Sequence, residues 1–343
     1  MPTIKDIARE ANVSVTTVSN VIHGKRSRVA KETIERVEKI IAANNYTPNM
    51  SARALVNKSS RIIAVINHLI QSQSISFLQD PFHGALVGGV ERKLRERGYY
   101  MMIRTVADEE ELFSLFRNWN FDGVILTGLF EDSFFARLIE SGKPVVLLDS
   151  YVKDDRVINI GLEDRQGGFI ATQHLIDKGH RDIVFASPRI IKGGVIDERF
   201  KGYQAALKKN SIPFRKENVY QQEITINEGI SLGHTLSERT DVTAVFATAD
   251  ILAAGIITGL TERNMGVPHD MSVVGFDDTV FSRVSNPPLT TIHQDAEEKG
   301  VIAAEVMVDC LENKALPKDR NIILPVSLIE RASVSFPGRA FSK

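Results

Sequence analysis

The sequence predicts a small all-α N-terminal domain followed by an α/β core of two doubly wound parallel-sheet lobes. Three observations support this prediction. The chain has 343 residues, more than one ordinary domain of about 100–200 residues. Near the N-terminus apolar residues recur at helical spacing, whereas from Ile62 onward short apolar runs alternate with helical segments. The composition, 43% hydrophobic and 25% charged, is typical of a globular chain rather than a disordered one.

Composition also argues against several other classes of protein. The apolar runs, such as 123–126 and 145–148, are a few residues long, far short of the about 20 that a membrane-spanning helix needs. The N-terminus is polar from its third residue, so we expect no signal peptide. Cys310, the single cysteine, excludes an internal disulfide and a cysteine-cluster zinc site. We therefore expect a cytoplasmic protein without a membrane partner.

Charge is distributed unevenly along the chain. Residues 1–61 contain eleven Lys and Arg against five Asp and Glu, a net charge of +6. Because the whole chain carries −1, the remaining residues carry −7. A basic head on a larger acidic body is typical of a polyanion-binding module joined to another kind of domain. A basic, merely solvated surface is the alternative explanation.

The first helix of the head is predicted from its capping residues. Thr3 and Asp6 have the spacing of a capping box, which opens a helix that runs through Ala11. Asn12 suits the left-handed conformation of the tight turn that follows. Ser14 then caps a second helix.

The second helix is predicted over about 15–22 and the third over about 30–44. Two short helices joined by a tight turn and followed by a third form the helix-turn-helix plan. The second helix of that plan enters the DNA major groove with its first residues against base edges. We therefore assign residues 1–47 to DNA binding, with a generic three-helix domain as the alternative. Thr16 and Asn20, with Val15, are expected to read bases directly. The other DNA contacts expected in the head are Thr3, Ser14, Thr17, Ser19, His23, Lys25, Arg26 and Arg28.

Residues 48–60 form a predicted hinge helix or linker. The segment is too short for a stable isolated helix, yet it contains good helix formers, so we expect it to fold against DNA. Ala52 and Arg53 are predicted to contact DNA, and Leu55 to wedge between base steps from the minor groove. A plain interdomain linker with one exposed leucine is the alternative.

The head resembles a known family. The matching segments are Thr3-Ile4-Lys5-Asp6-Ile7-Ala8, residues 13–22, Tyr46-Thr47-Pro48 and Ala52-Arg53-Ala54-Leu55. In these segments the chain resembles the LacI/GalR family of bacterial transcription repressors. The resemblance implies a homodimer that binds a pseudo-palindromic double-stranded DNA operator. Asn20 stands where many members carry Arg or His, so the resemblance does not predict the operator sequence.

In the core, buried strands alternate with helices. This alternation predicts parallel sheets covered by helices on both faces. The predicted strands are 62–66, 100–103, 123–126, 145–148, 183–185, 244–246, 273–276 and 289–292. The predicted helices are 83–97, 166–178, 200–209 and 252–264.

Ligands of such folds bind beyond the carboxyl ends of the strands. Asp149, Asp277 and Gln294 each follow a predicted strand, and Arg199 is expected to open a helix. Carboxylates and a guanidinium that converge on a cleft can bind pairs of hydroxyl groups, which suits a sugar or another polyol. An ion pair between Arg199 and Asp277 without ligand contact is the alternative. We expect Asp250 to be a helix cap rather than a ligand contact.

The core resembles the effector-binding core of the same family, which is similar to periplasmic sugar-binding proteins. The matching segments are Asp80-Pro81-Phe82, residues 171–176, Arg199-Phe200-Lys201-Gly202-Tyr203, Val274-Gly275-Phe276-Asp277-Asp278 and Pro288-Leu289-Thr290-Thr291-Ile292. The resemblance implies effector contacts at Phe82, Asp149, Arg199, Asp277 and Gln294. Ile224 stands where relatives often carry an aromatic residue that stacks on a sugar.

The resemblance also implies that residues 61–343 bind the effector and dimerise, in two lobes between which the chain crosses three times. The first lobe would comprise about 61–160 and 293–325, and the second about 161–292 and 326–340.

No catalytic or cofactor-binding motif is present. The chain lacks a dinucleotide fingerprint, a phosphate-binding P-loop, a His-Glu-Xaa-Xaa-His zinc motif and a nucleophile elbow. We therefore expect no enzyme, no cofactor and no metal, but a regulator controlled by a small molecule. Two alternatives remain: a catabolite-control regulator whose core docks a phosphorylated carrier protein, and a sugar-binding protein or enzyme with an incidental basic head.

Overall fold

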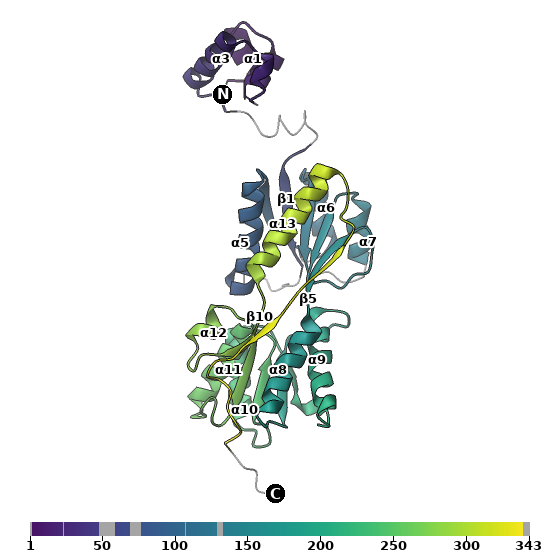
Figure 1. Ribbon diagram of the computed structural model, residues 1–343, viewed down its shortest axis with the longest axis vertical. Coiled ribbons are helices and arrows are strands. Elements are labelled where there is room, and N and C mark those ends of the chain that lie inside the picture. The colour runs from purple at the N-terminus through teal and green to yellow at the C-terminus, as the bar shows by residue number, and fades with distance from the viewer. Residues whose placement is uncertain are drawn as a thin grey trace. The chain divides into compact units, whose positions relative to one another are not determined.

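The computed structural model describes residues 2–22, 24–47, 59–68, 77–106, 108–128 and 133–338 (Figure 1). The chain divides into two compact units, Met1–Arg61 and Ile62–Lys343, called here the head and the core. Four predicted DNA contacts, His23, Ala52, Arg53 and Leu55, lie outside the described residues.

The head consists of three helices and a short 3-10 turn. They are α1 (Ile4–Glu10), α2 (Val15–Ile22), η1 (Arg26–Arg28) and α3 (Lys31–Ala43). Ile7, Val18 and Val37, one from each α-helix, are fully buried at the centre of the apolar cluster that joins them. The predicted turn is confirmed, because Asn12 has a φ of 50° between α1 and α2. The helix-turn-helix arrangement predicted from the sequence is therefore present.

The first lobe of the core is built on a six-stranded sheet in the order β11-β5-β4-β3-β1-β2, parallel throughout. Its strands are β1 (Ile62–Asn67), β2 (Tyr100–Thr105), β3 (Gly123–Thr127), β4 (Val145–Leu148), β5 (Ile158–Leu162) and β11 (Asn321–Leu324). Its helical elements are η2 (Phe77–Gln79), α5 (Pro81–Glu96), α6 (Glu109–Asn118), α7 (Ser133–Glu140) and α13 (Ala296–Asn313).

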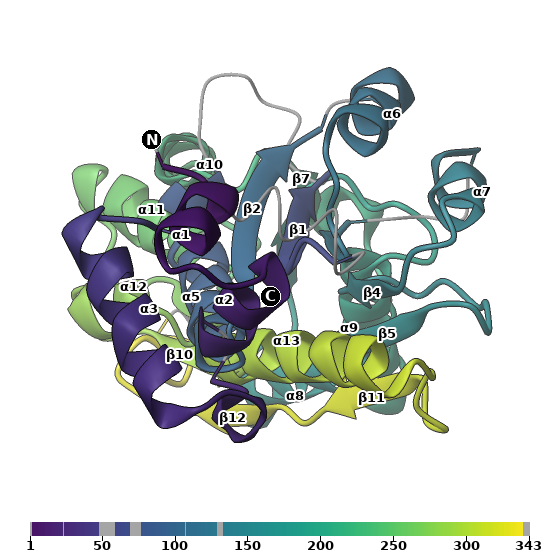
Figure 2. The ribbon, with the colours of Figure 1, turned by 90° about the horizontal axis from the view of Figure 1, so that it is seen from above.

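Helices cover both faces of this sheet. Alternate strand residues point to opposite faces: Ile63 and Val65 pack with α5 and α13, whereas Ala64 and Ile66 pack with α6 and α7. Seen from above, the two pairs of helices lie on opposite sides of the sheet (Figure 2). The predicted doubly wound architecture is confirmed for this lobe.

The second lobe repeats the plan in the order β12-β10-β9-β8-β6-β7, in which β12 is antiparallel to β10 and the other pairs are parallel. Its strands are β6 (Ile183–Ser187), β7 (Val219–Gln221), β8 (Ala244–Ala247), β9 (Ser272–Asp277), β10 (Thr290–His293) and β12 (Ser327–Ile329). Its helical elements are α8 (Asp164–Asp177), α9 (Val195–Lys209), η3 (Lys216–Asn218), α10 (Ile226–Ser237), α11 (Asp250–Glu262) and α12 (Val280–Val284).

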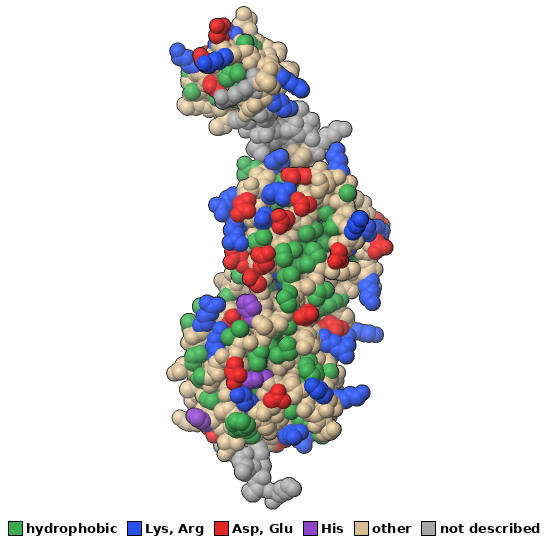
Figure 3. Space-filling view, in the orientation of Figure 1, with side chains coloured by type: hydrophobic (Ala, Val, Ile, Leu, Met, Phe, Trp, Pro, Cys, Tyr) green, Lys and Arg blue, Asp and Glu red, His purple; other side chains and the backbone are tan. Residues whose placement is uncertain are grey.

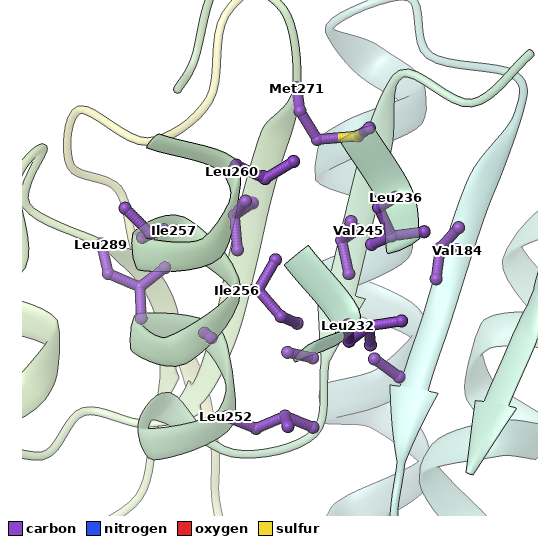
Figure 4. Packing of buried hydrophobic residues seen from close by; sticks show 14 of the residues in the cluster. Val184, Leu232, Leu236, Val245, Leu252, Ile256, Ile257, Leu260, Met271 and Leu289 are labelled. Atoms are coloured by element: carbon purple, nitrogen blue, oxygen red, sulfur yellow. The ribbon is translucent and has the colours of Figure 1, made fainter. Parts of the chain in front are cut away.

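Two apolar layers enclose the second sheet. Phe185, Phe246 and Phe276 pack against α8 and α9. On the other face, Val184 and Val245 pack against leucine and isoleucine side chains of α10 and α11 (Figure 4). The chain passes between the lobes three times, from β5 to α8, from β10 to α13 and from β11 to β12.

Helices α5 and α13 lie side by side in the first lobe (Figures 1 and 2). They are in direct backbone contact, because a Cβ atom at Gly89 would collide with the carbonyl oxygen of Glu297, and one at Gly300 with that of Leu86. Arg97, the residue after α5, pairs with Asp309 of α13 at 3.0 Å. Side chains of both charges gather on the surface over these two helices (Figure 3). Among the described residues, no helix has both the length and the apolar character needed to cross a bilayer.

Candidate functional site

The first turn of α2 is held by its predicted cap. The backbone N–H of Thr17 donates to Ser14 Oγ at 3.1 Å, and the hydroxyl groups of the two residues lie 2.9 Å apart. The same N–H also donates to the Ser14 carbonyl oxygen at 3.0 Å, so the side chain adds a second acceptor at the helix start. Val15, 40% exposed, and the exposed Thr16 project from the same turn. The arrangement presents two small side chains on a rigid helix end.

The other predicted DNA contacts surround this turn in the head. Thr3 is part of the predicted capping box, since its Oγ1 accepts from the backbone N–H of Asp6 at 3.3 Å and its own backbone N–H donates to Asp6 Oδ2 at 2.9 Å. Ser19 and Asn20 are partly exposed on α2. Lys25 and Arg28 are exposed in and beside η1. The backbone of Arg26 lies in η1, but its side chain is outside what the structure describes.

In the core, a first polar chain starts just beyond β4. Lys299 Nζ, on α13, donates to Asp149 Oδ1 at 2.7 Å and to Gln294 Oε1 at 2.9 Å. Gln294 Nε2 in turn donates to Asp277 Oδ1 at 2.6 Å, at the end of β9. The structure thus brings together three of the predicted ligand residues through a lysine that sequence reasoning missed.

A second polar chain starts two residues after Asp149. Tyr151 Oη donates to Asp164 Oδ2 at 2.6 Å, and Arg199 Nε donates to Asp164 Oδ1 at 2.7 Å. The guanidinium also donates to the carbonyl oxygen of Thr248 at 2.8 Å and lies 3.6 Å from the centre of the Phe276 ring. The predicted ligand residue Arg199 is therefore buried, and its guanidinium is held against Asp164 at the start of α8.

The segment between these two chains joins the lobes directly. Ser150, between Asp149 and Tyr151, forms an isolated antiparallel bridge with Gly194, the residue before α9. Helix α9 begins at Val195, so the prediction that Arg199 opens this helix is wrong. Its start is set by the Gly193-Gly194 turn, in which Gly193 has a φ of 80°. Arg199 consequently reaches Asp164 from the second turn of the helix.

Burial dominates the electrostatics of the carboxylates in this region. Burial raises the pKa of Asp277 well above its usual range, and the positive charge of Arg199 only partly opposes this rise. Burial also raises the pKa of Asp164, against the lowering effect of Arg199. Burial thus disfavours the charged form of both carboxyls, as is typical of buried acids. Such groups can serve as acceptors or donors toward the hydroxyl groups of a ligand.

Phe82 and Ile224 are placed differently. Phe82 lies in the first turn of α5, half-buried, with its ring centre 5.4 Å from Lys299 Nζ, so it borders the first polar chain. Ile224 is half-buried and packs against the apolar cluster between α10, α11 and the sheet. Because its side chain is apolar, Ile224 adds no polar group to either chain.

Asp250 has a role that the sequence did not predict. It is the first residue of α11, but it does not cap the helix, so that prediction is wrong. Its carboxylate accepts from the backbone N–H of Thr279 at 2.6 Å and from the hydroxyl of Thr291, also at 2.6 Å. These bonds connect α11 to the start of α12 and to β10. Burial raises the pKa of Asp250 to about 7, although the Thr291 and Thr279 bonds oppose this rise.

Lys299, Asp164 and Tyr151 are the residues that sequence reasoning missed. Lys299 is 0% exposed, within a helix whose other buried positions include Ala303 and Met307. A lysine in the apolar stripe of a predicted helix is a signal that sequence reading can detect, because lysine is almost never fully buried unless it is paired. Asp164 lies two residues beyond the end of β5, close to the kind of position that identified Asp149.

A surface pocket of about 410 Å³ opens beside the second polar chain. It is lined by Tyr151, Leu162, Glu163, Asp164, Arg165, Gln166, Phe169, Glu198, Ala205 and Ile323. None of the six predicted ligand residues lines this pocket. Within the part of the chain that the structure describes, no group of three His, Cys, Asp or Glu side chains is arranged to hold a metal ion.

Comparison with known proteins agrees with both units. The model of the lacI family of bacterial regulatory proteins matches residues 3–49, and that of a periplasmic binding protein-like domain matches residues 172–334. The chain is 31% identical over 341 residues to the HTH-type transcriptional repressor PurR of Actinobacillus pleuropneumoniae serotype 3 (strain JL03), covering 97% of this chain and 98% of that protein.

Two solved structures extend this likeness to the whole fold. The lac repressor dimer bound to operator and the anti-inducer ONPF has a TM-score of 0.83 and 26% identity, covering 97% of this chain and 99% of that one. The complex of the transcriptional regulator CelR with cellobiose has a TM-score of 0.72 and 28% identity, covering 97% and 100%. The resemblance predicted from sequence motifs is confirmed, and this chain belongs to the lacI family of bacterial regulatory proteins.

Proposed function

We propose that this chain is a cytoplasmic transcriptional repressor that binds a pseudo-palindromic operator as a homodimer. Its operator affinity would be controlled by a small carbohydrate bound between the lobes of the core. The observation that carries the proposal is the first turn of α2, where Ser14 fixes the helix end and Val15 and Thr16 stay exposed on a domain rich in Lys and Arg. No enzymatic reaction is assigned.

The DNA-binding part rests on geometry and charge. A helix of small polar residues fits the major groove, where hydroxyl and amide groups read base edges. Lys25 and Arg28 are exposed. They would contact phosphates, and such contacts supply much of the affinity for DNA and make it fall with salt. Among the solved relatives, one is bound to its operator. The role of Leu55 as a minor-groove wedge stays a prediction.

The homodimer is supported by an exposed apolar surface on the second lobe. Val280 and Val284, four residues apart on α12, are 55% and 68% exposed. Residues at this spacing lie on the same face of a helix. A self-complementary contact between two copies would cover them and would present two heads to the two halves of an operator.

The ligand part rests on the two polar chains. Asp149, Gln294, Asp277 and Arg199 combine acceptors and donors within one region between the lobes, which suits a ligand with many hydroxyl groups. One solved relative binds cellobiose. Since the chains join residues of both lobes, a ligand bound there would have different affinities for different arrangements of the lobes. That difference is what shifts a conformational equilibrium.

Selection of DNA from a random pool by the full-length protein tests the first part. We expect a two-fold symmetric sequence to be enriched, and Thr16→Ala to cost about 1–3 kcal/mol of discrimination at the base that it reads. Thr240→Ala, an exposed threonine of the core, is the matched control and should select the same sequence. No preference for any duplex over random competitor, with or without sugars, would contradict the proposal.

Thermal unfolding in the presence of sugars tests the second part. Any sugar that prefers the native core raises its melting temperature. The same sugar should change the affinity of the full-length protein for the selected operator. A sugar that stabilises the core and leaves operator affinity unchanged would separate ligand binding from regulation and would refute the control mechanism.

A further inference from the structure

Lys299 forms a buried charged pair with Asp149, one of the predicted ligand residues. Its side chain is 1% exposed, and its ammonium lies 2.7 Å from the carboxylate of Asp149, which is 12% exposed. A buried ammonium is very costly unless an opposite charge and further hydrogen bonds compensate it. Asp149 supplies the charge, and Gln294 Oε1 supplies a further acceptor at 2.9 Å. The lysine is thus neutralised inside the protein before any ligand arrives.

The second buried cation of the region is neutralised in the same way. Arg199, whose side chain is 8% exposed, pairs with the fully buried Asp164 at 2.7 Å. A third acid, Asp277, is hydrogen-bonded by Gln294 rather than paired with a lysine or arginine. The two cations are therefore matched by two carboxylates, and the third acid leaves no surplus of positive charge. An anionic ligand would have to displace an internal carboxylate from one of these two ion pairs, whereas an uncharged ligand breaks neither pair.

We propose that the Asp149–Lys299 pair is a specificity-determining element that makes the ligand site select uncharged, hydroxyl-rich molecules over the acids and phosphates of the same sugars. The inference rests on the proposed ligand-controlled function and narrows its ligand class. It also makes an asymmetric prediction. Removing the charge of Asp149 leaves the Lys299 ammonium without its counter-charge, so the site gains an attraction for anions. Removing the charge of Lys299 instead leaves Asp149 alone and repels anions further.

The experiment compares matched neutral and anionic probes on the full-length protein. The probes are D-glucose, D-glucuronate and D-glucose 6-phosphate, then D-galactose with D-galacturonate, and D-ribose with D-ribose 5-phosphate. Isothermal titration calorimetry at one ionic strength gives the neutral-to-anionic affinity ratio for each set. The variants are Asp149→Asn, Lys299→Met and the double variant. Lys178→Met removes a lysine that pairs with Glu330 on the outside of the second lobe and is the control.

We expect the wild type to bind the neutral member of at least one set and to prefer it by about tenfold or more. Asp149→Asn should lower that ratio by about tenfold or invert it, by the same reasoning. Lys299→Met should raise the ratio, and the double variant, which restores the charge balance, should return it toward the wild-type value. A wild type that prefers an anionic member, or an Asp149→Asn ratio equal to the wild-type ratio, overturns the proposal.

A measurement without ligand tests the pair itself. Each single variant leaves one buried charge without its partner, so each should lower the melting temperature of the core more than the double variant does. Additive shifts would overturn the pair as the unit of selectivity. Failure of every probe to bind would overturn the ligand class. If sequence-selective DNA binding persisted in that case, the DNA-binding half of the proposed function would stand while its carbohydrate half fell.

Discussion

The head and the two polar chains of the core differ in where their polar side chains lie. In the head, apolar residues such as Ile7 and Val37 are fully buried, and the side chains proposed to contact DNA lie at the surface. Along the two polar chains of the core, the charged residues are themselves buried, with Lys299 at 0% exposure and Arg199 at 7%. A surface that contacts a flexible polyanion gains from accessible charge. A site that orients a small molecule gains from fixed, desolvated polar groups.

This contrast has an energetic consequence. Exposed polar residues of the head contribute little to its free energy of unfolding. Their interactions can therefore contribute to DNA affinity without being needed for folding. Buried charges of the core contribute to stability and to ligand binding at once, because each one is compensated by an internal partner. Substitution of an exposed polar residue of the head should therefore change DNA affinity and leave stability nearly unchanged. Substitution of a buried charge of the core should change both ligand affinity and stability.

Loss of the Arg199 charge should have the largest effect on the core. Arg199→Met leaves the fully buried Asp164 without its guanidinium partner, which should lower the free energy of unfolding by about 3–5 kcal/mol. Urea unfolding followed by the fluorescence of Trp119, the single tryptophan and a residue of the first lobe, reports on the core. Arg156→Met, which removes a solvent-exposed pair with Asp154, should leave the midpoint unchanged. Equal effects of the two variants would remove the distinction between the buried pair and the exposed pair.

Truncation of a buried apolar side chain in the head is the corresponding test for that unit. Ile7 is 0% exposed in a small apolar cluster, and Ile7→Ala should cost about 2–5 kcal/mol. A domain of this size has little stability to lose, so we expect sequence-selective DNA binding to disappear. The Trp119 unfolding curve should stay unchanged, since the cluster lies entirely in the head. Ile7→Val, at about 0.5–1.5 kcal/mol, should keep DNA binding; its loss there as well would show that more than packing had changed.

The buried carboxyl of Asp250 predicts a pH dependence confined to the core. Its pKa is raised from 3.8 to about 7, so the native state holds a proton that the unfolded state has released. The resulting stabilisation is complete below the unfolded pKa and is lost as pH rises toward about 7, by at most about 1.4 kcal/mol per pH unit. Asp250→Asn, a neutral isostere, should flatten the curve of core stability against pH between about pH 5 and pH 7. An unchanged slope in this variant would assign the dependence to other groups.

Removal of the α2 cap should have the smallest effect. Ser14→Ala deletes the side-chain acceptor for the Thr17 backbone N–H, which should cost the head about 0.5–2 kcal/mol. Operator affinity should fall modestly, because the end of α2 frays without losing a base contact. Circular dichroism of the head and DNA titration measure the two effects. Ser14→Asp, which keeps an acceptor, should restore the stability; failure to do so would show that Ser14 acts otherwise than as a cap.

The architecture was largely predictable because buried parallel strands are continuous apolar runs. Strands β1, β3, β4 and β8 lie within two residues of their predicted limits. Strand β5 was missed because Asn159 and Gly161 interrupt its apolar sequence, although all five of its residues are buried. Strand β11 alternates between exposed and half-buried residues at a sheet edge, a pattern too weak to predict from four residues.

The ligand site was predictable only in part, and the reason is the range of its contacts. Asp149, Asp277 and Gln294 were found because they follow strands, a local signal. Lys299 contacts Asp149 across 150 positions of sequence, and no local pattern encodes that pairing. Asp250 shows the converse error, since a local rule predicted a cap, whereas contacts with Thr279 and Thr291 determine its environment.

The backbone contact between α5 and α13 has a mechanical consequence. Because Gly89 and Gly300 leave no side-chain layer between the two helices, repacking cannot absorb a displacement of one relative to the other. The two helices should therefore move as one rigid unit, and Lys299 lies in the first turn of α13. A ligand that shifts Lys299 would therefore be expected to move α5 together with α13.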